Sequence, residues 1–434
     1  MFRFRSQFVT NIVSNMGGNS VNSVLQLVLL LALSRFLNTS TYAAYLTASA
    51  LIGIAEIASD FGTKMWATRR FSGGTDINHT FRQCLAAKLF YTLMTLLVLS
   101  VLPLNLPAVT TLVILTAVAA TQPATDPFLW FLRSQDRLDV EAALVLVYRL
   151  VQAVALFVAA YVGTNLQTML LIWLACNVGR MVAEGRMQII RPVFRFDAQA
   201  PVHIRHVTAT ISEVFPIGAS LFLTTLYTRV GILLLNSFGT PEDVSVFGTA
   251  FRLVGAAGFV STSIILSSFP RLVRAIESQD LSAIRSVVSR KIHLVTLILL
   301  PICLGGILLS VPLSERLFSG DLIHVGKIVV MLMPGLYLVC INMGMKFTLN
   351  AFGLDWYDFM AVLPGYAAFF AFAFLAESYA WPVRVAIGWS LGELTIMCFR
   401  IGFLWKQNHH GGIPLGVIAG TTAILSFLVL HFPF

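Results

Sequence analysis

The sequence predicts an all-α polytopic membrane protein with two six-helix bundles and one additional C-terminal helix. Three observations lead to this fold class: an apolar composition, a series of runs long enough to cross a bilayer, and a likeness between the two halves of the chain. Of the 434 residues, 57% are hydrophobic and 11% are charged, and the mean hydropathy is +0.82. A water-soluble domain is less apolar and more charged, so we expect a chain that lies largely within a bilayer.

Thirteen apolar runs approach or exceed the roughly 20 residues that a transmembrane helix needs. They lie near 9–34, 43–61, 82–103, 107–131, 141–161, 165–187, 210–237, 244–269, 291–312, 325–350, 358–378, 382–404 and 413–432. The longest internal polar loop, 191–206, follows the sixth run. These positions predict an N-terminal six-helix bundle at 1–190, a cytoplasmic linker at 191–209, a C-terminal six-helix bundle at 210–405 and an additional transmembrane helix at 406–434.

The basic residues fix the expected orientation. When the N-terminus is placed in the cytoplasm, the loops on the opposite side hold only Arg35, Arg316, Lys327 and Arg384. This asymmetry follows the positive-inside rule, and it accounts for the net charge of +9 without a nucleic-acid partner. The segment 271–290 has apolar residues at helical spacing with arginines between them, which predicts an interfacial helix along the inner surface.

Residues that carry catalysis or bind metals show no matching pattern. The five cysteines and eight histidines lack the spacing of a disulfide framework or a metal site. The tripeptide Asp60–Gly62 matches a kinase magnesium motif in its letters only, because it ends a predicted span and no catalytic loop accompanies it. We therefore expect no enzyme activity, no metal and no cofactor.

The two halves contain similar segments. "RFLNTSTYAAYLTASALIG" at 35–53 resembles "NSFGTPEDVSVFGTAFRLVGAAG" at 236–258, with one residue inserted in the second copy. Both read as a tight turn that leads into a helix of aromatic and small residues. Six helices separate the copies, so they have the same orientation and are expected to be related by an axis along the membrane normal.

Longer stretches resemble a known family. The segments "LSRFLNTSTYAAYLTASALIGIAEIASDFGTKMWATRR" (33–70), "FPIGASLFLTTLYTRVGILLLNSFGTPEDVSVFGTAFRLV" (215–254) and "SSFPRL" (267–272) are similar to the polysaccharide-transporter branch of the MOP exporter superfamily. That branch contains the O-antigen (Wzx-type) flippases and is related to lipid II flippases and to MATE exporters. The resemblance implies a MATE-like pseudo-twofold arrangement. In many relatives an acidic residue follows the Arg229 equivalent by two positions, where this chain has Gly231.

Several ionisable residues fall at membrane depth. Counting from the nearest loops places Arg149 and Arg252 near the midplane and Arg229 nearer the outer side. Charges at this depth usually face a cavity or a partner, and a guanidinium matches the oxygens of a phosphate group. These arginines either line a basic cavity or are neutralised by carboxylates such as Glu393. Possible partners for a coupling ion or for these charges are Glu56, Asp60 and Glu393.

A row of carboxamides marks the first span. At about 100° per residue, all of its members share one narrow face of a helix. They are Asn11, Asn15, Asn19, Asn22 and Gln26. Carboxamides supply donors and acceptors for sugar hydroxyls, so this amide stripe predicts a wet, sugar-facing wall, although it is also consistent with interhelical hydrogen bonds. The predicted substrate-binding residues are therefore Arg149, Arg229, Arg252, Asn15, Asn19, Asn22 and Gln26.

The leading hypothesis from the sequence is a flippase for an undecaprenyl-pyrophosphate-linked oligosaccharide in the bacterial inner membrane, working by alternating access. The family resemblance implies this substrate class, used for O-antigen or exopolysaccharide. Expected partners are this substrate, membrane lipids, a coupling ion (Na⁺ or H⁺) and a polysaccharide polymerase. The alternatives are a MATE-type cation-coupled exporter, which predicts carboxylates in the first span, a membrane enzyme such as an O-antigen polymerase or ligase, and a structural scaffold.

Overall fold

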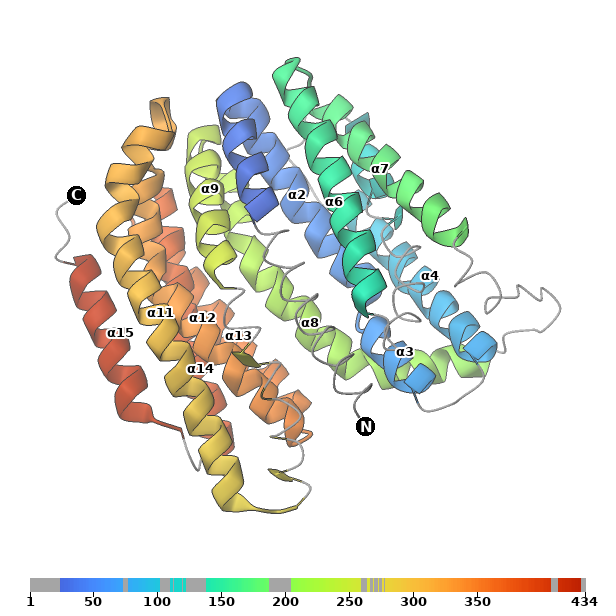
Figure 1. The fold of residues 1–434 in the computed structure, drawn as a ribbon, viewed down its shortest axis with the longest axis vertical. Coiled ribbons are helices and arrows are strands. Elements are labelled where there is room, and N and C mark those ends of the chain that lie inside the picture. The colour runs from blue at the N-terminus through green and yellow to red at the C-terminus, as the bar shows by residue number, and fades with distance from the viewer. Residues whose placement is uncertain are drawn as a thin grey trace. The chain divides into compact units, whose positions relative to one another are not determined.

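The computed structural model describes most of the chain. The described residues are 24–72, 77–101, 110–111, 113–118, 120–121, 138–186, 204–258, 264–265, 268, 272, 275–276, 278–406 and 413–430. Their regular structure is helical (Figure 1), which confirms the predicted all-α class. The chain forms two compact units, Met1–Arg229 and Val230–Phe434. The predicted linker at 191–209 lies mostly outside the described residues, so the predicted bundle limits stay a prediction.

The described part of the first unit starts with the apolar helical segment Val24–Phe36. It continues with α2 (Thr39–Asp60), α3 (Thr63–Ser72), α4 (Ile77–Val101), α6 (Leu138–Tyr161) and α7 (Leu166–Arg186). The long helix α8 (Ile204–Phe238) starts in this unit and ends in the second. The second unit contains α9 (Pro241–Ala257), α11 (Leu281–Leu317), the 3₁₀ turn η1 (Gly320–His324), α12 (Val325–Ala351), α13 (Asp355–Leu375), α14 (Trp381–Lys406) and α15 (Leu415–Leu430).

Eight helices among the described residues are long and apolar enough to cross a membrane. Many of their large apolar side chains are exposed, among them Leu297 at 70% and Leu308 at 66%. A bilayer would cover such surfaces. The protein is therefore a multi-pass membrane protein, as predicted. The predicted thirteenth span corresponds to α15, an apolar helix of 16 residues.

The two repeated segments have the same local structure. The side chain of Asn38 accepts a hydrogen bond from the backbone N–H of Thr41 at the start of α2. Thr240 does the same for Asp243 at the start of α9, where the Asp243 carboxylate also accepts from the Thr240 N–H. These N-caps satisfy backbone donors that a helix leaves open. Matching Asn38 to Thr240 also matches Phe36 to Phe238, so the two copies align at their caps without the insertion that the sequence suggested.

The predicted interfacial helix at 271–290 is wrong in its second half. Asp280 caps a new helix by accepting from the backbone N–H groups of Ser282 and Ala283 at 3.0 Å each. Gln279 precedes it with a φ of +53°, which breaks a continuous helix. Residues 281–290 therefore form the first turns of α11, the 37-residue helix that continues into the apolar span.

Within the second unit, α12 is the central helix. It contacts α9, α11, α13, α14 and α15, and its aromatic residue Tyr337 is fully buried. Two glycines of α12 allow close approach, because a Cβ atom at Gly335 would lie 2.5 Å from the Trp389 ring and one at Gly326 would lie 2.5 Å from the carbonyl of Ser310. In Figure 1, α15 lies at the edge of this unit beside α11.

Candidate functional site

Arg149 is a predicted site residue whose described contacts are with neutral groups. It lies on α6 within the apolar stretch Ala143–Tyr161, and its side chain is half-buried. Its Nη1 donates to Oε1 of Gln152 at 3.3 Å, and its Cζ lies 5.6 Å from the centroid of the Tyr148 ring. Both neighbours are neutral, and no ion pair of Arg149 occurs among the described residues. A charge in the bilayer core costs about 2.5–3.5 kcal/mol on insertion scales, so a bound anion would stabilise it.

Gln152 adds a second donor beside Arg149. The residue is 5% exposed, and its Nε2 has no hydrogen-bond partner among the described residues. Its Oε1 is already used by Arg149, three residues earlier on the same helix. An unsatisfied buried donor costs about 1–3 kcal/mol. Arg149 and Gln152 therefore form a pair of donors, which we call the donor pair, in the membrane-spanning part of α6.

The donor pair continues into a polar contact between α6 and α7. The Tyr148 hydroxyl donates to Oδ1 of Asn177, whose Nδ2 donates to Oγ1 of Thr121 at 3.1 Å. The guanidinium of Arg180 lies 4.9 Å from the Tyr148 ring centroid. Arg180 is itself paired with Glu184 at 2.7 Å, and the two side chains are 9% and 2% exposed. One tyrosine ring is therefore in contact with two guanidinium groups, of which one is neutralised by a carboxylate.

Sequence reasoning did not assign Arg180 a role in the site. It lies in the last part of the predicted span 165–187, next to the linker that the sequence places in the cytoplasm. A signal was nevertheless present, since Asn177, Arg180 and Glu184 are three and four residues apart and share one face of a helix. A polar face on an otherwise apolar span indicates a partner within the protein.

The two acidic candidates on α2 differ. Glu56 is half-buried, and its charge acts on the Tyr148 hydroxyl. Asp60, at the end of α2, is paired with the buried Lys88 of α4 at 3.3 Å and accepts from Thr63 Oγ1 at 3.1 Å. Asp60 therefore joins α2, α3 and α4, whereas Glu56 belongs to the polar surroundings of the donor pair.

The other two predicted arginines lie in different units. Arg229 ends the first unit, and its guanidinium lies against α2, because a Cβ atom at Gly53 would be 3.6 Å from Nε and Nη2. Gly53 and Glu56 are three residues apart, so Arg229 approaches the face of α2 that carries Glu56. Arg252 is half-buried on α9 in the second unit.

Glu393 lies in a buried polar network of the second unit. It is 3% exposed on α14, and Nδ2 of Asn342 donates to its Oε2 and to its backbone carbonyl, each at 2.7 Å. Arg400 donates to the Asn342 carbonyl at 3.0 Å and is paired with Asp358 at 2.8 Å. Lys346 approaches the other oxygen of Asp358 at 3.5 Å. We call these five residues the C-terminal network.

The remaining sequence predictions concern the amide stripe and Gly231. Asn15, Asn19 and Asn22 lie outside the described residues, as does Asn11, and Gln26 is exposed on the helix Val24–Phe36. A Cβ atom at Gly231 would lie 2.8 Å from Val385 and 3.0 Å from Phe247. No acidic side chain fits there without a shift of these neighbours. A group of three or more metal-binding side chains does not occur among the described residues.

Comparison with known proteins gives the family. The family model described as "Polysaccharide biosynthesis protein" matches residues 8–276, which is more than half of the chain. The chain belongs to the polysaccharide biosynthesis protein family. The resemblance to a polysaccharide family that the sequence indicated is thereby confirmed. No curated protein sequence matches this family member.

Solved structures similar to this polysaccharide biosynthesis family member show the fold. The lipid II flippase MurJ in an inward closed conformation has a TM-score of 0.75 at 12% identity, covering 97% of this chain and 92% of its own. An inward-facing multidrug resistance MATE transporter of the MOP superfamily has a TM-score of 0.67 at 14% identity, covering 93% and 96%. A MATE transporter from Vibrio cholerae has a TM-score of 0.61 at 16% identity, covering 93% and 98%. The predicted MATE-like fold is confirmed.

Proposed function

We propose that this protein is a flippase that moves an undecaprenyl-pyrophosphate-linked oligosaccharide from the inner to the outer leaflet of a bacterial inner membrane by alternating access. The family match and the MOP transporter fold support a transporter for polysaccharide biosynthesis. The single observation that carries the substrate class is the donor pair, Arg149 and Gln152. Its cation has no carboxylate partner among the described residues, and its amide has a free buried donor.

The donor pair suits the polar head of such a substrate. A guanidinium binds phosphate oxygens through parallel N–H donors, and an amide N–H donates to a phosphate or hydroxyl oxygen. Moving a pyrophosphate out of water is costly unless fixed donors replace its hydration. The described contacts of Arg149 are neutral, so binding an anion there needs no ion pair to be broken.

The other predicted residues take supporting roles in this proposal. Arg229, Arg252 and the amide stripe line the substrate path, with the arginines facing phosphate and the carboxamides facing sugar. Glu56, Asp60 and Glu393 act as charge partners or couple the cycle to Na⁺ or H⁺. The glycan is delivered to a polysaccharide polymerase for O-antigen or exopolysaccharide.

A MATE-type exporter is the alternative within the same fold. Cation-coupled export of organic cations requires carboxylates that face the substrate, and an arginine without a carboxylate partner would repel a cationic drug. The donor pair therefore favours the anionic substrate.

Reconstitution in liposomes tests the proposal directly. We expect purified protein to increase the fraction of an undecaprenyl-pyrophosphate-linked glycan that external periodate oxidises, compared with protein-free liposomes. A rate equal to that of protein-free liposomes, together with uptake of a cationic dye, would identify a MATE-type exporter instead. Cysteines placed at His203 and Thr240 test the orientation, because a cytoplasmic N-terminus places the first inside and the second outside.

A further inference from the structure

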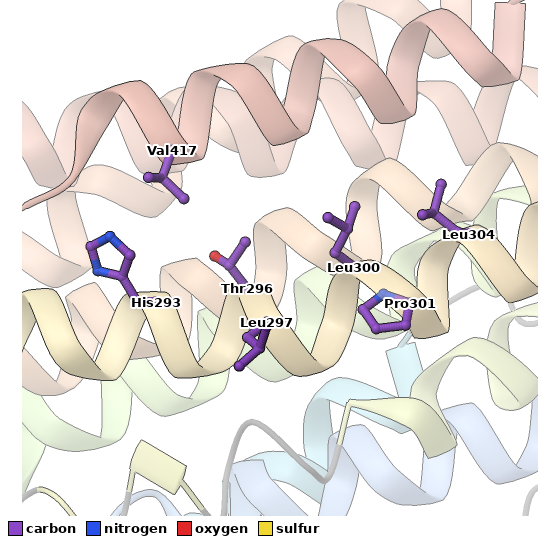
Figure 2. Close-up of a pocket in the computed structure, with 7 residues that line it drawn as sticks. All are labelled: His293, Thr296, Leu297, Leu300, Pro301, Leu304 and Val417. Carbon is purple, nitrogen blue, oxygen red and sulfur yellow. The ribbon is translucent and has the colours of Figure 1, made fainter.

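An apolar groove of about 430 Å³ lies between α11 and α15 in the second unit. Figure 2 shows α11 side chains along one wall and Val417 of α15 on the other. The α11 wall runs from His293 through Leu297 and Leu300 to Leu304. Leu297 is 70% exposed, so the groove opens toward the surroundings of the protein and is not a sealed cavity.

The groove exists because α15 is attached to its neighbours at few points. Its buried residues are Ile418, Thr421 and Leu425. Thr421 of α15 lies near the hydroxyl of Tyr337 on α12, which itself lies 3.0 Å from Thr296 Oγ1 of α11. The hydrogen bond joins α11 to α12, and the side chains beside Thr296 leave the space of the groove open.

An open apolar groove in a membrane-spanning helix pair is expected to be filled by hydrocarbon. Water at this depth would find no hydrogen-bond partners among leucine and proline side chains. An empty groove would lose the dispersion contacts of every atom that lines it. The chain of a lipid restores those contacts at no desolvation cost, because it comes from an equally apolar surrounding.

The length of the groove matches one leaflet. His293 and Leu304 are eleven residues apart on α11, which corresponds to about 16 Å at about 1.5 Å per residue. The hydrocarbon core of a bilayer is about 30 Å thick, so one leaflet contributes about half of that. The groove therefore accommodates a single chain from the headgroup region to the midplane.

The polar end of the groove carries basic and hydroxyl groups. At about 100° per residue, Ser286, Ser289 and Arg290 fall within about 60° of His293 on the same face of α11. Arg290 is exposed, and the His293 ring Nδ1 lies 2.8 Å from the Ser289 carbonyl and 3.2 Å from its hydroxyl. A guanidinium beside hydroxyl donors favours an anionic phosphate group.

We propose that this groove is the binding site of a resident anionic phospholipid, with one chain between α11 and α15 and its phosphate at Arg290. The lipid completes the packing of α15 against α11. This role is independent of the transported substrate, so it can hold or fail whatever the protein transports.

Native mass spectrometry of the purified full-length protein tests this site. After delipidation, dioleoyl phosphatidylglycerol and dioleoyl phosphatidylcholine are added in turn. We expect the wild type to retain one phosphatidylglycerol, and Leu300→Trp, which fills the groove, to retain it about tenfold less. Leu309→Trp is the matched control, since Leu309 is 56% exposed on α11 but does not line the groove, and it should retain the lipid. Arg290→Gln should remove the preference for phosphatidylglycerol.

Equal lipid retention by wild type and Leu300→Trp would overturn the proposal. So would a retained species with the mass of a polyprenyl phosphate, because the groove would then serve the substrate. If Leu300→Trp does not fold, a phosphatidylglycerol with a diazirine in its chain replaces the variant. Photolysis with the wild-type protein should label residues 293–304 and Val417, and labelling confined to other helices would contradict the site.

Discussion

Arg149 and Arg400 are both arginines of membrane-spanning helices, yet their surroundings differ. Arg149 contacts a glutamine amide and a tyrosine ring. Arg400 is 4% exposed and makes a hydrogen-bonded ion pair with Asp358 through Nε and Nη2. An intramembrane arginine therefore does not reveal its role by depth alone. Its role depends on its partner, because an arginine in an ion pair is already neutralised in the resting protein, whereas an arginine with neutral neighbours can bind an anion.

The comparison also separates stability from transport. Removing one member of a buried ion pair leaves the other charge uncompensated, which typically costs about 3–5 kcal/mol. Removing Arg149 leaves no such charge among the described residues. Substitutions in the C-terminal network should therefore lower the stability of the fold, whereas substitutions in the donor pair should lower transport.

The largest expected effect is at Asp358. Asp358→Asn leaves Arg400 and Lys346 without their carboxylate, so we expect a loss of stability on the order of 3–5 kcal/mol, seen as low abundance and a lower melting temperature in detergent. Asp321→Asn is the control, because Asp321 is exposed in η1. An unchanged melting temperature for Asp358→Asn would remove the distinction between the two arginines.

The second prediction concerns Arg149. Arg149→Gln should keep abundance and melting temperature near those of the wild type while lowering glycan export about tenfold or more, since a bound anion would lose its charged donor. Arg149→Lys should retain part of the export because the charge survives without the bidentate geometry, and Arg149→Glu should be worst. Arg316→Gln, at an exposed position at the end of α11, is the control.

An Arg149→Gln variant that exports glycan normally, or that is simply degraded, would make Arg149 structural. The same experiment with Arg229→Gln and Arg252→Gln extends the comparison. Arg229 lies against Gly53, so normal export by its variant would restrict the substrate path to other side chains.

The third prediction tests the amide stripe at its one described position. Gln26 is exposed and Val28 is 57% exposed, so exposure alone does not distinguish water from lipid. If the stripe faces water, a cysteine at Gln26 should react with a charged thiol reagent and a cysteine at Val28 should not. The native Cys398 is exposed and is replaced by serine beforehand. If neither cysteine reacts with the reagent, the amide stripe is better explained by interhelical hydrogen bonds than by a water-facing wall.

The smallest expected effect is at Glu213, near the start of α8. A hydrogen bond from Trp66 Nε1 at 2.8 Å, together with Arg70 at 3.0 Å, holds the pKa of the Glu213 carboxyl below its usual value. A lowered pKa stabilises the folded state above the unfolded pKa of about 4.3, and this contribution is lost as the pH falls through the folded value. The Glu213–Arg70 pair is half-exposed, so its contribution to the free energy of unfolding is below about 1 kcal/mol.

Glu213→Gln should therefore melt slightly below the wild type at pH 7, and the difference should shrink as the pH falls from about 4.3 through the lowered pKa of the folded state. Thermal unfolding between pH 7 and pH 3.5 measures this difference. Glu315→Gln, at an exposed position on α11, should match the wild type at every pH. A melting-temperature difference between Glu213→Gln and the wild type that grows as the pH falls would contradict a lowered pKa of Glu213.

The sequence predicted the parts of this protein that depend on local pattern. Apolar runs predicted the helical membrane class, and the turns expected in the segments 35–53 and 236–258 precede α2 and α9. The prediction of one interfacial helix over 271–290 failed because the helical periodicity continues across Asp280. The side chain of Asp280 caps a new helix there. Residue depth could be counted along a helix, which placed Arg149 and Glu393 within apolar helices.

Partners could not be predicted in the same way, because they come from distant parts of the chain. Tyr148 and Asn177 are 29 residues apart, and Asp358 and Arg400 are 42 residues apart. Hydrophobic periodicity says which face of a helix is apolar, but not which polar group on another helix it meets. Whether an arginine is paired or available is therefore a property of the packed helices.

The position of Arg400 in the chain has a consequence for biosynthesis. Its helix, α14, also carries Glu393, and insertion scales assign each such charge a cost of about 2.5–3.5 kcal/mol at the centre of a lone helix. The partners of both residues, Asn342 on α12 and Asp358 on α13, precede α14 in the sequence. When the ribosome delivers α14, its partners have already been made. Insertion of this helix should therefore depend on α12 and α13, and in a nascent chain stalled after α13, Asp358 would lack its ion pair with Arg400 until α14 arrives.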